Sequence, residues 1–176
     1  MPEHHHPKAV ADLDAEESLV RAAIEHPEIV DKVLRVVTAK DFGDHVCSKI
    51  WAAVETLARS RNTIGFDEVV RALSPEDVLG PDGCSDAKSV ADCVREILGA
   101  SGTSQEAMWC ALRIRTQSLR NALLNQLMPT ERALIAHQSK EVKDLLRESC
   151  KLATEYRRAH LRDSRELRRL QQAGRN

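Results

Sequence analysis

The feature that most constrains the fold is the spacing of apolar residues, which recur every three or four positions along nearly the whole chain. This spacing places them on one face of an α-helix, whereas a half-buried β-strand alternates apolar and polar residues. Aromatic residues make up only 3% of the sequence, so the core must be built from Leu, Val, Ile and Ala. That mixture favours helices over β-sandwiches. We therefore predict an all-α protein.

Helix-breaking and helix-capping residues divide the first hundred residues into short helices. A capping residue followed three positions later by Glu is typical of a helix start, and Pro is tolerated in a first helical turn. The chain is expected to break at Ser74-Pro75 and again at 80–83, because Pro and Gly oppose helix continuation. The expected segments are a first helix capped by Asp14, a second from Pro27, a third after the turn Thr38–Asp41, a fourth around Val69, and a fifth over 87–98.

Beyond Gly102 the apolar spacing predicts two long helices joined by a short break. The first is expected over 104–127, with Pro129 interrupting it, and the second begins near Thr130 or, if the loop is longer, near Ser139. Two such helices form an antiparallel hairpin. The predicted fold is thus a compact bundle of about five short helices followed by a long antiparallel helical hairpin. The expected parts are a disordered tail (1–11), a helical globular domain (12–102), and the hairpin with a basic C-terminal arm (103–176).

Apolar residues of the two long helices exceed what one short bundle can cover, which predicts a symmetric homodimer with the hairpins packed together. The positions expected to form this dimer are Met108, Leu112, Leu119, Leu123, Leu127, Val142, Leu145, Leu152 and Tyr156.

Charge is divided unevenly along the chain. Residues 1–100 carry 11 basic and 19 acidic side chains, and residues 101–176 carry 15 basic and 8 acidic ones. The basic arm could contact nucleic acid or an acidic partner, although a solvated helix gives the same charge run. Because the acidic body repels DNA and the arm lacks aromatic residues for base stacking, we expect nucleic-acid binding to be weak or absent. The candidate contact residues are Arg157, Arg158, Arg162, Arg165, Arg168 and Arg169.

Motifs of common enzyme chemistry are missing from the sequence. It contains neither the phosphate-binding GxxxxGK[ST] loop nor the zinc-binding HExxH motif. We therefore expect no catalytic residues, cofactor or metal, and no ATP hydrolysis. The five cysteines are scattered without a CxxC pair, the N-terminus does not resemble a secretion signal, and no apolar run is long enough to span a bilayer. A reduced cytoplasmic protein without a membrane segment is expected.

Several short motifs lie between Asp14 and Leu127. An Ala-Glu pair (Ala15-Glu16) lies in the opening of the first helix, and a Pro-Glu turn (Pro27-Glu28) enters the second. An Asp-Phe pair (Asp41-Phe42) is followed by an Ile-aromatic pair (Ile50-Trp51) eight and nine positions after the Phe, and Trp109 precedes Arg120 by eleven positions. In type and spacing these motifs resemble the N-terminal domain of the DnaB-type replicative DNA helicases, and the chain has Gly43 and Cys47 where that family usually has Tyr and His.

The resemblance implies a small helical domain whose C-terminal hairpin packs against a second copy. In the helicases such dimers build a collar above the motor ring, and the collar receives the primase. The family's ATPase motor would follow the hairpin, whereas this chain stops at Asn176, so we expect a free-standing relative or a fragment of a larger product.

The leading hypothesis is a non-catalytic interaction module in DNA replication, part of or acting on the primosome, that binds the helicase, the primase or a loader. The alternatives are a nucleic-acid-binding protein that uses the arginine-rich arm and a self-associating scaffold of unrelated function.

Overall fold

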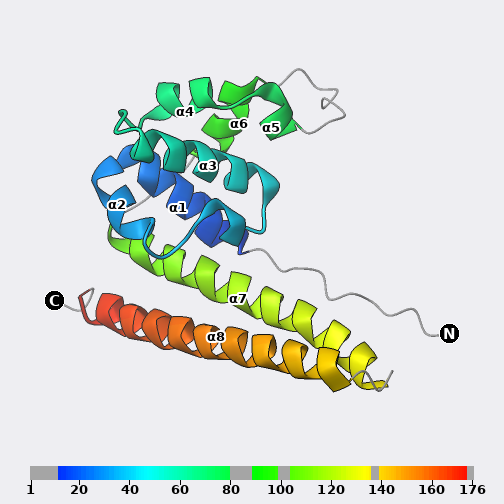
Figure 1. The fold of residues 1–176 in the computed structure, drawn as a ribbon. Coiled ribbons are helices and arrows are strands. Elements are labelled where there is room, and N and C mark those ends of the chain that lie inside the picture. The colour runs from blue at the N-terminus through cyan, green and yellow to red at the C-terminus, as the bar shows by residue number, and fades with distance from the viewer. Residues whose placement is uncertain (1–11, 80–88, 99–103, 136–138, 174–176) are drawn as a thin grey trace.

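The structure, a computed structural model, describes residues 12–79, 89–98, 104–135 and 139–173, and every regular element in these ranges is a helix (Figure 1). This confirms the predicted all-α fold, while the expected tail over 1–11 and the boundary near 102 lie outside the described residues. In chain order the elements are α1 (Leu13–Glu25), η1 (Pro27–Ile29), α2 (Val30–Val33), η2 (Ala39–Asp41), α3 (His45–Arg59), α4 (Phe66–Ala72), α5 (Pro75–Leu79), α6 (Val90–Ile97), α7 (Ser104–Ile135) and α8 (Ser139–Ala173).

The helices stack in layers. We call the part from α1 to α6 the head, and α7 with α8 the hairpin. In the head α1 packs on α3, and α4 and α5 pack on the other side of α3 (Figure 1). The first part of α7 lies along α1, and α8 runs antiparallel to α7 on the side away from α1 (Figure 1). The end of α7 and the start of α8 therefore project beyond the head, while the end of α8 returns to it (Figure 1).

The core of the head is completed by the start of α7. Leu19 and Val20 of α1 and Ile50 and Trp51 of α3 are fully buried, and each such side chain contributes about 2–3 kcal/mol by its burial. Four residues from the first turns of α7 join the same cluster, and three of them are small, which lets α7 approach α1 closely. They are Ala107, Cys110, Ala111 and Ile114. The head would expose part of its core if α7 were removed.

Two buried charged residues of α1 tie neighbouring elements together. The carboxylate of Glu16 accepts hydrogen bonds from the backbone N–H groups of Gly43 (2.8 Å) and Asp44 (2.9 Å), directly before α3. Arg21 donates two hydrogen bonds to the carbonyl of Ile97 at the end of α6. Both side chains satisfy backbone groups that a helix terminus leaves without partners. Glu16, which belongs to the Ala-Glu pair, therefore fixes the entry into α3.

One predicted helix boundary in the head is wrong, and another is confirmed. The helix α1 begins at Leu13, so Asp14 lies in its first turn and does not cap it. Ser74-Pro75 breaks the chain as predicted, because α4 ends at Ala72 and Pro75 is the first residue of the separate helix α5. At that position a missing N–H costs nothing, and Ser74 exchanges hydrogen bonds with Asp77.

The predicted interruption at Pro129 is also wrong, since α7 continues through it to Ile135. The second long helix begins at Ser139, the later of the two expected starts. A proline within a helix removes one backbone hydrogen bond and costs about 3 kcal/mol. Contacts with α8 extend along α7, and they offset this local cost. The hydroxyl of Thr130 donates to the carbonyl of Gln126 (2.8 Å) in the adjacent turn.

The position of Glu16 generates a stability prediction. Glu16→Ala leaves two partly buried N–H groups without their acceptor, so we expect the free energy of unfolding to fall by about 2 kcal/mol. Glu16→Gln, which keeps one acceptor oxygen, should lose less. Urea denaturation followed by circular dichroism measures both. The neighbouring Glu17→Ala is the control and should change stability by no more than about 0.5 kcal/mol. An equal effect of Glu16→Ala and Glu17→Ala would contradict the assigned role.

Candidate interaction cleft

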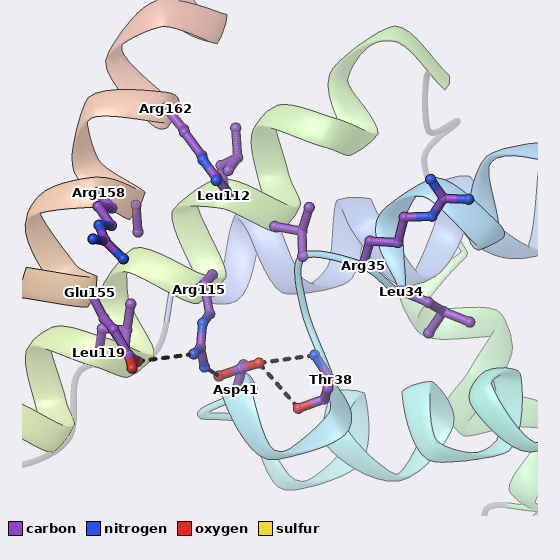
Figure 2. Close-up of a pocket in the computed structure, with 12 residues that line it drawn as sticks. Leu34, Arg35, Thr38, Asp41, Leu112, Arg115, Leu119, Glu155, Arg158 and Arg162 are labelled. Carbon is purple, nitrogen blue, oxygen red and sulfur yellow. Dashed lines mark hydrogen bonds and ion pairs between the residues drawn. The ribbon is translucent and has the colours of Figure 1, made fainter. Parts of the chain in front are cut away.

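The site is organised by Asp41, a buried carboxylate at the end of η2. One of its oxygens accepts hydrogen bonds from the backbone N–H (2.9 Å) and the hydroxyl (3.1 Å) of Thr38, which closes the turn. The other oxygen accepts from the guanidinium of Arg115 (2.6 Å) and the hydroxyl of Ser118 (2.7 Å), both on α7. Asp41 therefore shapes its own turn and attaches that turn to the hairpin (Figure 2).

The same turn is held from the other side by α3. Phe42 stacks against Trp51, with ring centroids 5.4 Å apart. The backbone N–H of Ala39 donates to the carboxylate of Glu55 (2.7 Å). Because α3 and α7 both hold this short segment, its backbone is fixed where it faces the hairpin. The Asp-Phe and Ile-aromatic pairs found in the sequence thus have a structural reason, which is the anchoring of this turn.

A cleft of about 460 Å³ opens between this segment, α7 and α8 (Figure 2). Its apolar lining includes Leu34 and Val36 from the head, Leu112 and Leu119 from α7, and Ala159 from α8. Its charged lining consists of Arg35, Asp41, Arg115, Glu155, Arg158 and Arg162. Four arginines therefore face two acidic residues around an aliphatic surface.

The two acidic residues are both engaged by the same arginine. Arg115 lies 2.6 Å from the carboxylate of Asp41 and 3.7 Å from that of Glu155. Within the described ranges, Arg35, Arg158 and Arg162 form no ion pair. The wall formed by α8 is therefore left with excess positive charge.

The arginines of the predicted arm lie on different sides of α8. Arg158 and Arg162 are one turn apart and line the cleft. Arg157 and Arg168 lie on the side of α8 opposite the buried Ala159, given about 3.6 residues per turn. Arg165 and Arg169 are exposed beyond the cleft, and Arg169 lies 3.4 Å from Glu166. The structure thus brings two of the six candidate arginines to the site.

Two further lining residues, Leu112 and Leu119, were predicted from the sequence, but for the dimer, and sequence reasoning missed the rest of the cleft. Arg115 lies 74 positions from Asp41, and nothing in the local pattern of either residue predicts their contact. Arg35 follows α2 in a part of the chain that has no basic cluster. Asp41 was marked only as a member of a family motif. The charge run of the arm was the one local signal that led to this site.

The residues predicted for the dimer are distributed along the hairpin. Leu112 and Leu119 are only 6% and 4% exposed in the single chain, whereas Leu127 is 50% exposed. The other predicted positions are half-buried, and they are Met108, Leu123, Val142, Leu145, Leu152 and Tyr156. The prediction did not include three further leucines of the hairpin that are also about half exposed, Leu134, Leu146 and Leu161.

The part of the chain that the structure describes shows no features of a metal site, a membrane span or a reactive thiol. There, no three His, Cys, Asp or Glu side chains gather in a way that could hold a metal ion. None of the described helices combines the length and apolarity needed to cross a membrane. Burial raises the pKa of the Cys110 thiol to about 11 and that of Cys47 further. Both thiols are protonated at neutral pH and therefore lack the thiolate of a nucleophile.

A second polar contact joins the end of α8 to the start of α1. Arg113 of α7 lies over the ring of Trp109, 4.5 Å from its centroid, and forms an ion pair with Asp12. Asp163 of α8 lies near the same guanidinium, and one of its carboxyl oxygens is buried without a hydrogen-bond partner in the described structure. Burial raises the pKa of Asp163, although the charges of Arg113 and His160 oppose the shift. Folding therefore disfavours the ionised form of Asp163 compared with an aspartate in the unfolded chain.

Comparison with known proteins adds a family and a fold. The family described as "DnaB-like helicase N terminal domain" matches residues 8–100. Among solved structures, the N-terminal domain of DnaB helicase from Mycobacterium tuberculosis superposes with a TM-score of 0.65 at 16% identity. That match covers 83% of this chain and 99% of the other, so it extends into the hairpin, and at this identity it shows the fold alone. No curated protein sequence matches the chain.

The raised pKa of Asp163 generates a prediction about pH. At neutral pH the carboxylate is charged and costs stability, so Asp163→Asn should raise the melting temperature. As the pH falls through the folded pKa the wild-type carboxyl takes up its proton, and the two proteins should converge below the ordinary aspartate pKa of about 3.9. Melting curves over a pH series measure this difference. A wild-type protein more stable than Asp163→Asn at neutral pH would contradict the prediction.

Proposed function

Because the chain belongs to the family of DnaB-like helicase N-terminal domains, we propose that it acts in DNA replication as a non-catalytic protein-interaction module. In this role it forms a homodimer through the hairpin and binds the replicative helicase, the primase or a loader as a cytoplasmic component of the primosome. The observation that carries the proposal is the apolar face of the hairpin, which continues past the head and loses its cover there.

The face is followed most easily along α7. Leu112, Leu119, Leu123, Leu127 and Leu134 recur at intervals of seven or four residues, which keeps them on one side of the helix. The first two are buried beside the head and α8, whereas the last two are about half exposed. The change occurs where the hairpin leaves the head (Figure 1). An exposed row of leucines of this kind is typical of a protein interface.

A second copy of the chain fits this face best. Identical hairpins related by a two-fold axis bring the exposed leucines of the row, Leu127 and Leu134, together, and those of each chain then cover those of the other. Leu146 of α8 is also exposed and widens the surface. The positions deeper in the hairpin, including Leu145 and Leu152, support this surface from within. Dimerisation would leave the cleft near the head open to a different partner.

The arginine-rich arm supports nucleic-acid binding as the second candidate function. Its exposed arginines would bind phosphates, but residues 157–176 contain no aromatic side chain, and Tyr156 just before them is half-buried. Without a stacking platform, we expect such binding to be weak and strongly dependent on salt.

The dimer is tested by light scattering. We expect a dimer for the wild-type chain at micromolar concentrations and a monomer for Leu127→Glu/Leu134→Glu, because charges would replace apolar contacts at the interface. Leu161→Glu/Leu13→Glu is the control pair, since both leucines are 47% exposed and lie away from the row. A wild-type monomer at tens of micromolar would refute the dimer, as would a dimer that the row variant leaves intact.

Partner binding is tested with purified proteins from the same organism. The immobilised chain is exposed in turn to the replicative helicase, the primase and the loader, with interferometry as the readout. We expect saturable binding of at least one of them, because interaction modules of this family act in replication. If none binds although the chain is dimeric, the self-associating scaffold becomes the better explanation.

A further inference from the structure

The cleft combines an aliphatic surface with arginines that lack acidic partners among the described residues, and we propose that it docks an acidic peptide segment of a partner protein. The segment would place an apolar side chain against Leu112, Leu119 and Ala159, and its carboxylates beside Arg158 and Arg162. This inference deepens the proposed function and rests on it, since it specifies the chemistry of the partner that an interaction module would recognise.

The α8 wall of the cleft is positively charged and therefore complements an acidic ligand. Arg158 and Arg162 are exposed, one helical turn apart, and Figure 2 shows both side chains on the side of α8 that faces the cleft. Two guanidinium groups at this spacing can each form paired hydrogen bonds with a carboxylate. The two acidic residues of the lining cannot fill this role, because both lie against Arg115. An acidic ligand is therefore the complement that this wall lacks.

The floor and the far wall of the cleft are fixed before a ligand binds. Its floor belongs to two packed helices, and its far wall is the turn fixed by Asp41, so little ordering is needed when a ligand binds. Leu112 and Leu119 are mostly covered, but they still line the open space together with Leu34 and Val36. A floor of aliphatic side chains suits a Leu, Ile or Val of a peptide.

The lining of the cleft and the charge of the head favour a peptide over nucleic acid as the ligand. None of the residues that line the cleft is aromatic, so a base would find no ring on which to stack. Residues 1–100 carry eight more acidic than basic side chains, and a polyanion that extended from the cleft along the head would meet this negative charge. A short acidic peptide ends before it reaches the negative charge of the head.

The experiment measures fluorescence anisotropy with a labelled peptide in which one leucine is flanked by glutamates on both sides. A matched peptide with glutamines in place of the glutamates, and a labelled duplex DNA, serve as comparison probes. We expect the acidic peptide to bind the full chain saturably, the glutamine peptide to bind less, and added salt to weaken the complex. Failure of the acidic peptide to bind the wild-type chain overturns the proposal. DNA that binds more tightly than the peptide and depends on the same arginines also overturns it.

Two charge-reversed variants locate the binding. Arg158→Glu/Arg162→Glu should weaken peptide binding roughly tenfold or more, which corresponds to at least one decade in Kd. Arg157→Glu/Arg168→Glu makes the same change of net charge on the opposite side of α8 and should keep most of the binding. Arg35→Glu, at the rim on the head, should cause a smaller loss. If both α8 variants lost the same amount of peptide affinity, the peptide would be attracted diffusely to the arm, and the proposal that it binds in the cleft would be overturned.

Folding and assembly are checked separately from binding. The exchanged arginines of α8 are exposed, so both variants should keep the wild-type circular dichroism spectrum and the same mass in light scattering. A dimer that persists while the acidic peptide fails to bind overturns the cleft alone. A wild-type chain that is monomeric in light scattering would instead contradict the proposed function.

Discussion

The structure depends on the packing of the first turns of α7 against the core of the head. Ala107 and Ala111 let this helix approach α1 closely, and Asp41 then bonds to Arg115 and Ser118 at the next turns. Every later feature follows from this contact. It sets the direction in which the hairpin leaves the head, brings α8 back beside the turn at Thr38–Asp41, and so creates a cleft between parts of the chain far apart in sequence. The apolar packing provides most of the stabilisation, while the buried carboxylate fixes which turn of α7 meets the head.

The sequence predicted the elements better than their ends. Apolar spacing identified α1, α3, α7 and α8, because a buried helix face has to repeat its apolar residues regardless of what it packs against. Pro75 and Pro129 were both predicted to break the chain; α4 does end before Pro75, whereas α7 continues through Pro129. A proline has a local cost, and whether the chain stops there depends on whether tertiary contacts exceed it. Around Pro129 the helix continues, and α7 as a whole packs along α8.

The candidate site was less predictable than the fold, for a related reason. Arg158 and Arg162 were found because they belong to a dense run of charge, which is visible in any short window of sequence. Their position beside Arg35 and Asp41 depends on how α8 returns to the head, and this information is distributed over the whole hairpin. The family resemblance marked Asp41 and Phe42, but their task emerged only from the contacts with α7 and α3.

The proline within α7 has a further consequence for local unfolding. Beyond the head, the described residues of the hairpin are held by contacts between its own two helices, and near Pro129 one backbone hydrogen bond is missing. The far end of the hairpin can therefore fray and re-form while the head stays folded, as a separate cooperative unit. In hydrogen exchange such a unit loses its amide protons sooner than α1 or α3. A second chain that covers the leucine row would slow this exchange, so assembly and local folding of the hairpin are thermodynamically linked.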